Sequence, residues 1–309
     1  MAFGAELRPL NPLVPFRDDA GLGCAPIGNL FTPVRDADAV ATVGAALARD
    51  VRFFDTAPLY GSGESERKLG LALRGVPRDD YVIATKAGRI LVDETGAPVR
   101  GAASGRDSVT DLSRDGVLRS VEGSLARLGV DRIDVLHLHD PLDVDRALSD
   151  SFPALVELRE QGVIRAVSVG LGKLEPLERI AAEAPLDVLM EAGRLTLLDR
   201  TAIDRLLPIA VRRGIGVIAA GVFNSGVLVD PVASPFYEYK PAPPDVREAA
   251  LRLRDVCASF GVRLADAAVQ FPLRTGADAV VVGARTPGEV DAFVDGLDVA
   301  VPTPLWESL

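Results

Sequence analysis

Histidine, cysteine and tryptophan are scarce in this sequence. Its 309 residues include two histidines, two cysteines and one tryptophan. The two cysteines, Cys24 and Cys257, cannot form a disulfide framework or a four-ligand zinc site, so we expect two reduced, buried thiols. The two histidines, His137 and His139, are too few for a catalytic zinc centre, which usually takes three protein ligands. The sequence therefore predicts no metal site, and we interpret His137 as a core histidine.

Positive charge is also in short supply. Lys and Arg total 34 against 44 Asp and Glu, giving a formal net charge of −10. This sign argues against a nucleic-acid binder and against a surface attracted to anionic lipid. The chain has no apolar run of about 18 residues and no signal-peptide pattern at its start. We expect a cytoplasmic protein, a monomer or homodimer, that acts on a small molecule.

Short apolar runs alternate with amphipathic stretches of helical length. Such a pattern predicts parallel strands covered by helices, and eight repeats fit a (β/α)₈ TIM barrel better than the alternative, a doubly wound sheet. We expect a single domain over residues 1–309. The expected strands lie at 21–28, 51–55, 81–87, 132–139, 163–169, 186–190, 215–220 and 278–283.

Two segments stand out from this repeat. Residues 88–112 form the one long connection, which we expect to be a loop at the rim of the active site, because loops of that length are usually functional. Residues 241–275 read as a helical insert before the last strand. Whether the long loop contacts substrate or is a solvated flap stays open at this stage.

Four ionisable residues gather where three neighbouring strands end. Asp55, Lys86 and His139 end the strands expected at 51–55, 81–87 and 132–139, and Tyr60 follows in the next loop. Barrel enzymes place their chemistry at this end of the strands. Asp55 can pair with Lys86, whose ammonium can then stabilise a Tyr60 phenolate. A phenol titrates at about 10, and a neighbouring cation lowers its pKa toward the useful range.

The loops after the last two expected strands are candidates for phosphate binding. TIM barrels frequently bind phosphate there. In the first loop, Asn224, Ser225 and the Gly226 backbone could donate hydrogen bonds. In the second, Arg285 could pair with phosphate or stack on a base. The alternative is a polar turn and a helix start without ligand.

These residues resemble the aldo-keto reductase superfamily. The segments that carry the resemblance are FDTAPLYGSGESERKLG (53–69), IATKAGR (83–89), LRSVEGSLARLGVDRIDVLHLHDP (118–141) and VVGARTPGEV (281–290). The family is a (β/α)₈ barrel that binds NAD(P). Its catalytic tetrad maps onto Asp55, Tyr60, Lys86 and His139. Within the family the chain is similar to the aldose 1-dehydrogenase branch, which includes L-fucose, L-galactose and pyridoxal dehydrogenases.

The resemblance also implies binding residues. Glu289 stands where NADP-preferring relatives often carry an arginine, so NAD is the preferred cofactor, with NADP as the alternative. The expected substrate contacts are Phe31, His139 and Arg194. The expected cofactor contacts are Asn224, Ser225, Gly226, Leu228, Gly283, Arg285, Thr286 and Glu289.

The expected reaction is oxidation of the anomeric hydroxyl of a free aldose, such as L-fucose, to a lactone by hydride transfer to NAD(P). The alternatives are a pyridoxal 4-dehydrogenase or a biosynthetic carbonyl reductase. A non-catalytic nucleotide-binding regulatory subunit is a further one, which the intact tetrad disfavours. Aromatic residues are 5% of the chain, so a large aromatic cage for a steroid-like ligand is not expected.

Overall fold

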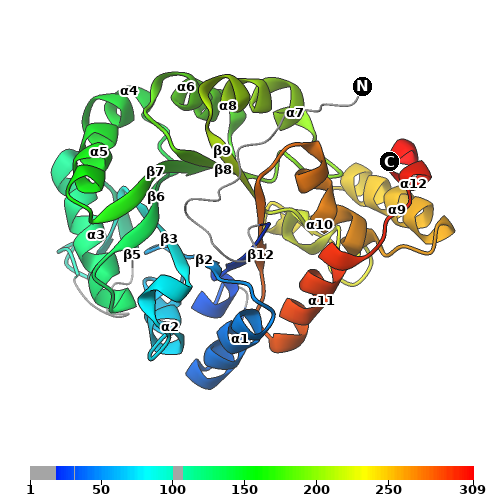
Figure 1. Cartoon of the computed structure of the whole chain (residues 1–309), viewed down its shortest axis with the longest axis horizontal. Helices are drawn as coiled ribbons and strands as arrows, with labels where there is room; N and C mark the ends of the chain where they lie inside the picture. Colours follow the sequence, from blue (N-terminus) through cyan, green and yellow to red (C-terminus); the bar gives the residue numbers. More distant parts are fainter. Residues whose placement is uncertain (1–18, 31, 100–106) are drawn as a thin grey trace.

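Eight parallel strands close into a barrel that is ringed by helices (Figure 1). The computed structural model describes residues 19–30, 32–99 and 107–309. The predicted (β/α)₈ barrel is confirmed, and the doubly wound sheet is excluded by the closure. Around the barrel the strands are β1 (Ala20–Gly23), β12 (Ala279–Gly283), β9 (Gly216–Ala220), β8 (Val188–Ala192), β7 (Ile164–Leu171), β6 (Ile133–His139), β3 (Val82–Ala87) and β2 (Phe53–Asp55).

The helices lie between consecutive strands along the chain, on the outside of the barrel. In the described residues α9 and α12 extend beyond the ring and lie side by side at the right of Figure 1. The α-helices are α1 (Asp36–Ala48), α2 (Glu64–Ala72), α3 (Arg114–Leu128), α4 (Val144–Arg146), α5 (Phe152–Glu160), α6 (Leu174–Glu183), α7 (Thr201–Arg205), α8 (Leu207–Arg213), α9 (Pro244–Ser259), α10 (Leu264–Thr275), α11 (Pro287–Asp298) and α12 (Thr303–Ser308). Short turns of other helix types are η1 (Pro26–Gly28), η2 (Arg78–Asp80), η3 (Ala147–Ser151) and η4 (Asn224–Gly226).

The barrel interior is filled by the inward-facing residues of its strands. Apolar side chains at alternate positions make this layer, because successive strand residues point to opposite faces. A larger apolar cluster fills the space between strands and helices, so the barrel is a packed core rather than a pore. The interior layer comprises Phe53, Val82, Ala84, Val135, Ala166, Val188, Met190, Ile218, Ala279 and Val281.

The first strand is shorter than the sequence predicts. β1 ends at Gly23, and the rest of the expected strand forms the turn η1. Pro26 lies in this turn, and because proline has no backbone N–H it cannot donate to a strand ladder. The turn brings Gly28 under the loop that carries Tyr60.

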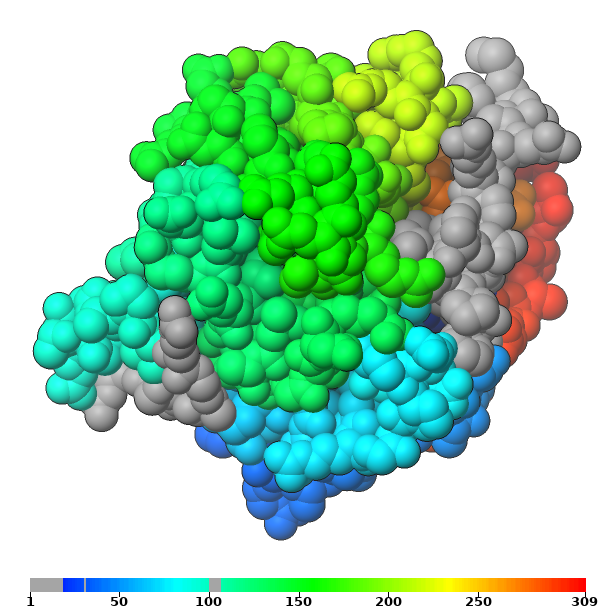
Figure 2. All heavy atoms as spheres, turned by 60° about the vertical axis from the view of Figure 1, so that its left-hand side comes forward, coloured from blue at the N-terminus to red at the C-terminus, as the bar shows by residue number. Residues whose placement is uncertain are grey.

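The long connection at 88–112 contains strands that the sequence analysis did not predict. β4 (Arg89–Val92) pairs antiparallel with β5 (Asp107–Thr110). The described residues that follow β4 project from the body of the molecule at the left of Figure 2. A second small hairpin joins β10 (Phe236–Tyr237) to β11 (Lys240–Pro241) after the barrel strand β9. In the described part of the chain, no helix is long and apolar enough to cross a membrane.

Candidate active site

The four predicted catalytic residues meet at the carboxyl-terminal end of the barrel. Lys86 Nζ lies 2.8 Å from both carboxylate oxygens of Asp55 and 2.9 Å from the Thr56 carbonyl oxygen. The same ammonium lies 4.9 Å from the centre of the Tyr60 ring. The Tyr60 and His139 rings meet edge to face, with centroids 6.1 Å apart. Three strand ends and one loop thus build a contiguous group of ionisable side chains.

Backbone contact holds Tyr60 in place. Gly61 has φ of +61°, and a Cβ there would lie 1.9 Å from the Gly28 carbonyl oxygen. A Cβ on Gly28 would in turn lie 3.0 Å from the Tyr60 carbonyl oxygen. Only glycine permits this close approach together with the left-handed backbone. The start of α2 adds a further restraint, because the Ser65 N–H donates to the Tyr60 carbonyl oxygen at 3.2 Å.

Burial dominates the electrostatics of Tyr60. Desolvation raises the pKa of Tyr60 to about 12, although the Lys86 ammonium opposes this shift. Lys86 lowers the pKa of the phenol, as expected, but burial raises it by more. The net pKa therefore lies above the ordinary value, and the expectation that it lies below is wrong. Burial lowers the pKa of Lys86, but the Asp55 carboxylate outweighs it, so the pKa of Lys86 is raised and the ammonium stays charged. Tyr60 is consequently a neutral phenol beside a permanent cation at neutral pH.

Both histidines are neutral and buried. Burial, reinforced by the Lys86 charge, lowers the pKa of each well below its usual value. His137 Nδ1 lies 2.7 Å from Ser168 Oγ, and His137 Nε2 lies 3.5 Å from Asp55 Oδ1. His139 is the last residue of β6, with its ring against Tyr60. A neutral imidazole can donate or accept one hydrogen bond at a reacting oxygen without changing charge.

Comparison with known proteins identifies the family of this chain. A model of the aldo/keto reductase family matches residues 20–304. The chain belongs to the aldo/keto reductase family. Its similarity to a D-threo-aldose 1-dehydrogenase from a Pseudomonas species is 38% identity, covering 94% of this chain and 92% of the relative. A pyridoxal 4-dehydrogenase from Microbacterium luteolum is 36% identical, with the same coverage of both chains.

More distant relatives support the same assignment. An L-galactose dehydrogenase from Arabidopsis thaliana is 33% identical over 94% of this chain and 87% of its own. Among solved structures, a glycerol dehydrogenase from Gluconobacter oxydans is similar at 25% identity with a TM-score of 0.74, covering 94% of this chain and 89% of that one. As an aldo/keto reductase the protein is an oxidoreductase, and enzymes of this family use NAD(P)H.

The family's nicotinamide cofactor would bind at the barrel mouth, where three strands carry small residues at or next to their ends. The ends of β7, β8 and β9 carry Gly170, Ala192 and Ala220. A Cβ on Gly170 would lie 3.8 Å from Lys86 Cε and 3.7 Å from His137 Cβ, so the glycine leaves the floor of the mouth clear. Buried Asn224 contributes a side-chain oxygen that has no hydrogen-bond partner among the described residues. These features fit a flat, polar group lying across the barrel mouth.

The loop after β9 uses much of its own hydrogen-bonding capacity. The N–H groups of Asn224 and Gly226 donate to the carbonyl oxygens of Gly221 and Phe223 within the turn. Ser225 Oγ accepts from the Tyr239 N–H at 2.9 Å. Leu228, in the same loop, is fully buried in a satellite core cluster. The roles of these residues toward cofactor stay predictions.

The loop after β12 joins a cation to a carboxylate. Glu289 accepts hydrogen bonds from the backbone N–H of Arg285 at 2.7 Å and from its Nη2 at 3.1 Å. Thr286 caps α11 by accepting from the Glu289 N–H. Gly283 ends β12 against Pro26, whose Cγ would lie 3.0 Å from an added Cβ. The Glu289 carboxylate thus occupies the start of α11, where a helix otherwise attracts anions.

Of the predicted substrate contacts beyond His139, the structure describes Arg194, whereas Phe31 lies outside the described residues. Arg194, after β8, donates from Nε to the Gly172 carbonyl oxygen at 3.0 Å and from Nη1 to Asp199 at 3.0 Å, and its Nη2 pairs with Glu238. Arg194 therefore clasps three loops together at the rim. Whether it also contacts substrate stays a prediction.

Three residues at the mouth were not singled out from the sequence. Arg89 and Asp140 form an ion pair beside His139, with Arg89 Nη2 and Asp140 Oδ2 3.7 Å apart. Tyr239 lies at the tip of the β10–β11 hairpin, where burial raises its pKa, the Lys86 charge opposes this shift and the Asp140 charge adds to it. Arg89 and Asp140 lay within the motifs IATKAGR and HDP, where each follows a tetrad residue by one to three positions. That adjacency was the available signal for these two.

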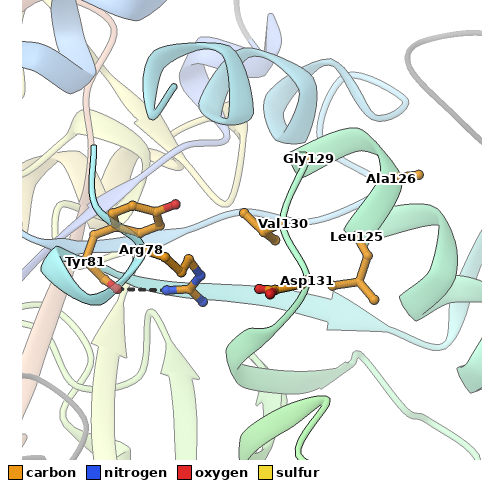
Figure 3. Close-up of a pocket in the computed structure, with 7 residues that line it drawn as sticks. All are labelled: Arg78, Tyr81, Leu125, Ala126, Gly129, Val130 and Asp131. Carbon is orange, nitrogen blue, oxygen red and sulfur yellow. Dashed lines mark hydrogen bonds between the residues drawn. The ribbon is translucent and has the colours of Figure 1, made fainter. Parts of the chain in front are cut away.

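A separate surface pocket lies at the opposite end of the barrel. It is lined by Arg78, Tyr81, Asp131 and four residues at the end of α3 and just after it, which Figure 3 shows as sticks. Arg78 donates to the Tyr81 carbonyl oxygen at 3.0 Å and stacks over its ring. Because these residues precede β3 and β6, the pocket is remote from the tetrad. The active-site candidate is the tetrad, not this pocket.

Proposed function

We propose that this enzyme oxidises the anomeric hydroxyl of a free aldose to a lactone, with NAD as the preferred cofactor. The observation that carries the proposal is the Asp55–Lys86–Tyr60 arrangement with His139 at the ring edge. Similarity to an aldose dehydrogenase and to an L-galactose dehydrogenase supports a sugar as the substrate.

The protein's part in the reaction is proton transfer and positioning. A bound nicotinamide supplies the hydride acceptor. The substrate hydroxyl lies between Tyr60 and His139, where His139 orients it. Tyr60, as a phenolate, removes the hydroxyl proton while the hydride leaves the carbon that bears this hydroxyl. Lys86 stabilises the phenolate by charge, and Asp55 keeps Lys86 protonated and fixed.

The preference for NAD is proposed from the start of α11. Arg285 is already paired with Glu289, so its charge is neutralised where an adenosine 2′-phosphate would need a cation. The Glu289 carboxylate would repel a phosphate, whereas it can accept a hydrogen bond from a ribose hydroxyl. Both effects act in the same direction and favour the cofactor without the extra phosphate.

Carbonyl reduction is the second candidate, and the Tyr60 pKa of about 12 favours it. A phenol that is neutral at physiological pH is ready to donate a proton to a carbonyl oxygen. The same residues serve both directions, so the substrates present in the cell decide which one operates. Pyridoxal oxidation remains a further alternative, supported by the similarity to a pyridoxal 4-dehydrogenase.

A substrate panel tests the proposal. The purified enzyme is incubated with L-fucose, D-arabinose, L-galactose, pyridoxal and simple ketones, each with both cofactors, and nicotinamide absorbance is followed. We expect NAD-dependent oxidation of at least one aldose, with one NADH formed per sugar and the lactone or its acid as the product. Oxidation of pyridoxal or reduction of ketones alone, without any aldose turnover, would refute the sugar assignment and leave the tetrad's chemistry standing.

A further inference from the structure

The residue that follows His139 has an unusual backbone and an unusual position. Asp140 adopts φ of +47°, in the left-handed region, while its N–H donates to the Gly170 carbonyl oxygen at 3.0 Å. In this conformation Asp140 Oδ2 lies 3.7 Å from His139 Nε2. A carboxylate is therefore held beside the imidazole that faces the reacting group.

Arg89 holds this carboxylate from the other side. Its Nη2 lies 3.7 Å from the same Asp140 oxygen, and its Nε is buried without a hydrogen-bond partner among the described residues. Both contacts to the carboxylate are longer than a hydrogen bond, and an ionised carboxylate offers about four acceptor sites. The Asp140 side chain is also 40% exposed. Asp140 thus keeps capacity to accept hydrogen bonds from a ligand.

The charges of this pair select a type of substrate. A negatively charged substituent would be repelled by Asp140, and a positively charged one by Arg89. A hydroxyl can donate to the carboxylate and accept from the guanidinium, so it satisfies both groups at once. An uncharged polyol therefore fits this wall of the site better than a simple ketone, which can only accept.

We propose that Asp140 is a substrate-binding residue, whose carboxylate accepts a hydrogen bond from the hydroxyl on the carbon next to the reacting carbon. This inference rests on the proposed function, because it assigns a subsite to a vicinal hydroxyl of the sugar. Arg89 is the corresponding positioning residue, which orients the carboxylate beside His139. The pair makes the enzyme selective for α-hydroxylated substrates.

Substrate pairs that differ in one hydroxyl test the assignment. Asp140→Asn tolerates a left-handed backbone, and Asp140→Gly removes the side chain at the same φ without strain. With L-fucose and NAD⁺ we expect Asp140→Gly to lose roughly ten- to a hundredfold in kcat/KM, the range for a hydrogen bond to a charged group. With 2-deoxy-L-fucose the same variants should lose little. The Asp140 variants should therefore lower the ratio of kcat/KM for L-fucose to that for 2-deoxy-L-fucose. Arg89→Met should lower the same ratio.

Asp50→Asn is the matched control. Asp50 also has a left-handed backbone, with φ of +60°, and pairs with Arg52 at 3.2 Å, but it precedes β2 at the other end of the barrel. Its substitution should leave the ratio between the two sugars unchanged. Equal losses for both sugars in the Asp140 variants would overturn the inference, since they would show a general effect on His139 or on folding.

The proposed function can fail separately. If the wild type oxidises no aldose, the same variants are assayed in the reductive direction with D-glyceraldehyde and 3-hydroxypropanal, which differ only in the α-hydroxyl. A selective loss with D-glyceraldehyde would support the role of Asp140 even though aldose oxidation had been refuted. Equal losses with both aldehydes would overturn the role of Asp140 as well.

Discussion

Carboxylates at the amino-terminal end of the barrel join neighbouring strands, whereas several buried polar atoms at the carboxyl-terminal end have no hydrogen-bond partner among the described residues. Asp134 accepts from the Ile83 N–H at 2.8 Å, Asp187 from Val167 at 2.7 Å and Asp278 from Val217 at 2.7 Å. At the other end, within the described residues, buried atoms of His137, His139, Glu191 and Asn224 have no hydrogen-bond partner.

This difference separates stability from function. A buried polar atom without a partner costs about 1–3 kcal/mol, so unpartnered atoms collect where a ligand can supply the missing bond. Burial also raises the pKa of the Glu191 carboxyl group to about 8, so its charged form is disfavoured there. The two ends use similar residue types, but most of the unpartnered buried atoms lie at the carboxyl-terminal end, whereas among the described residues the amino-terminal end has Arg78 Nε.

The largest expected effect contrasts a tyrosine at each end. Tyr60→Phe should reduce kcat by about 10²- to 10⁴-fold, because it removes the proton-transferring hydroxyl. Cofactor binding, followed by fluorescence titration, should be nearly unchanged. Tyr81→Phe, before β3, is the control and should leave kcat unaltered. Near-normal turnover in Tyr60→Phe would contradict the mechanism.

A change at the amino-terminal end should affect folding and not chemistry. Asp134→Ala removes the acceptor of the Ile83 N–H and the partner of Arg78, 2.7 Å away. We expect the free energy of unfolding to fall by about 3 kcal/mol, as for a broken buried pair, with kcat retained. Urea unfolding measures the first quantity. Asp79→Ala, which removes an exposed partner of Arg132, is the control and should change the free energy of unfolding by less than about 0.5 kcal/mol. A loss of kcat in Asp134→Ala at normal stability would contradict the prediction, because it would show that the two ends are coupled.

The pH dependence sharpens the comparison at the tetrad. Tyr60 must be deprotonated to oxidise a substrate, and its pKa is raised to about 12. The phenolate fraction, and with it kcat/KM for oxidation, should therefore rise by up to about tenfold per pH unit from neutrality upward. Reduction needs the neutral phenol and should be nearly flat over the same range. Lys86→Met removes the positive charge that lowers the pKa of Tyr60, so the pH profile of oxidation by this variant should move to higher pH. An unchanged pH profile would exclude this role of Lys86.

The smallest expected effect concerns cofactor choice at α11. Glu289→Arg replaces the carboxylate that pairs with Arg285 by a second cation. The ratio of kcat/KM for NADP over NAD should rise roughly tenfold, the scale of one charge-assisted hydrogen bond. Glu289→Gln is the control that separates loss of repulsion from gain of a cation. Higher efficiency of the wild type with NADP would show that this position has been misread.

The sequence alone predicted those site residues that lie at the carboxyl-terminal ends of strands. Alternating apolar runs predicted the barrel, and the ends of three runs predicted that Asp55, Lys86 and His139 would meet, as they do. This succeeds because parallel strands bring their carboxyl ends to one edge, whatever the helices between them do. The 88–112 connection shows the limit, since its β4–β5 hairpin carries too short a pattern to distinguish from a loop.

Other features were decided by tertiary structure. Asp140 follows His139 in the chain, but its left-handed backbone, its hydrogen bond to the Gly170 carbonyl oxygen and its position beside Arg89 involve residues that are distant in sequence. Arg194 donates hydrogen bonds to Gly172 and Asp199 in neighbouring loops, and the sequence around Arg194 does not indicate these contacts. The pKa of Tyr60 depends on how completely distant segments desolvate its phenol, and here burial outweighs the nearby cation. Sequence thus determined which groups lie at the site, because period and topology are local rules, whereas their charge states and free bonding capacity arise from packing between residues far apart in the chain.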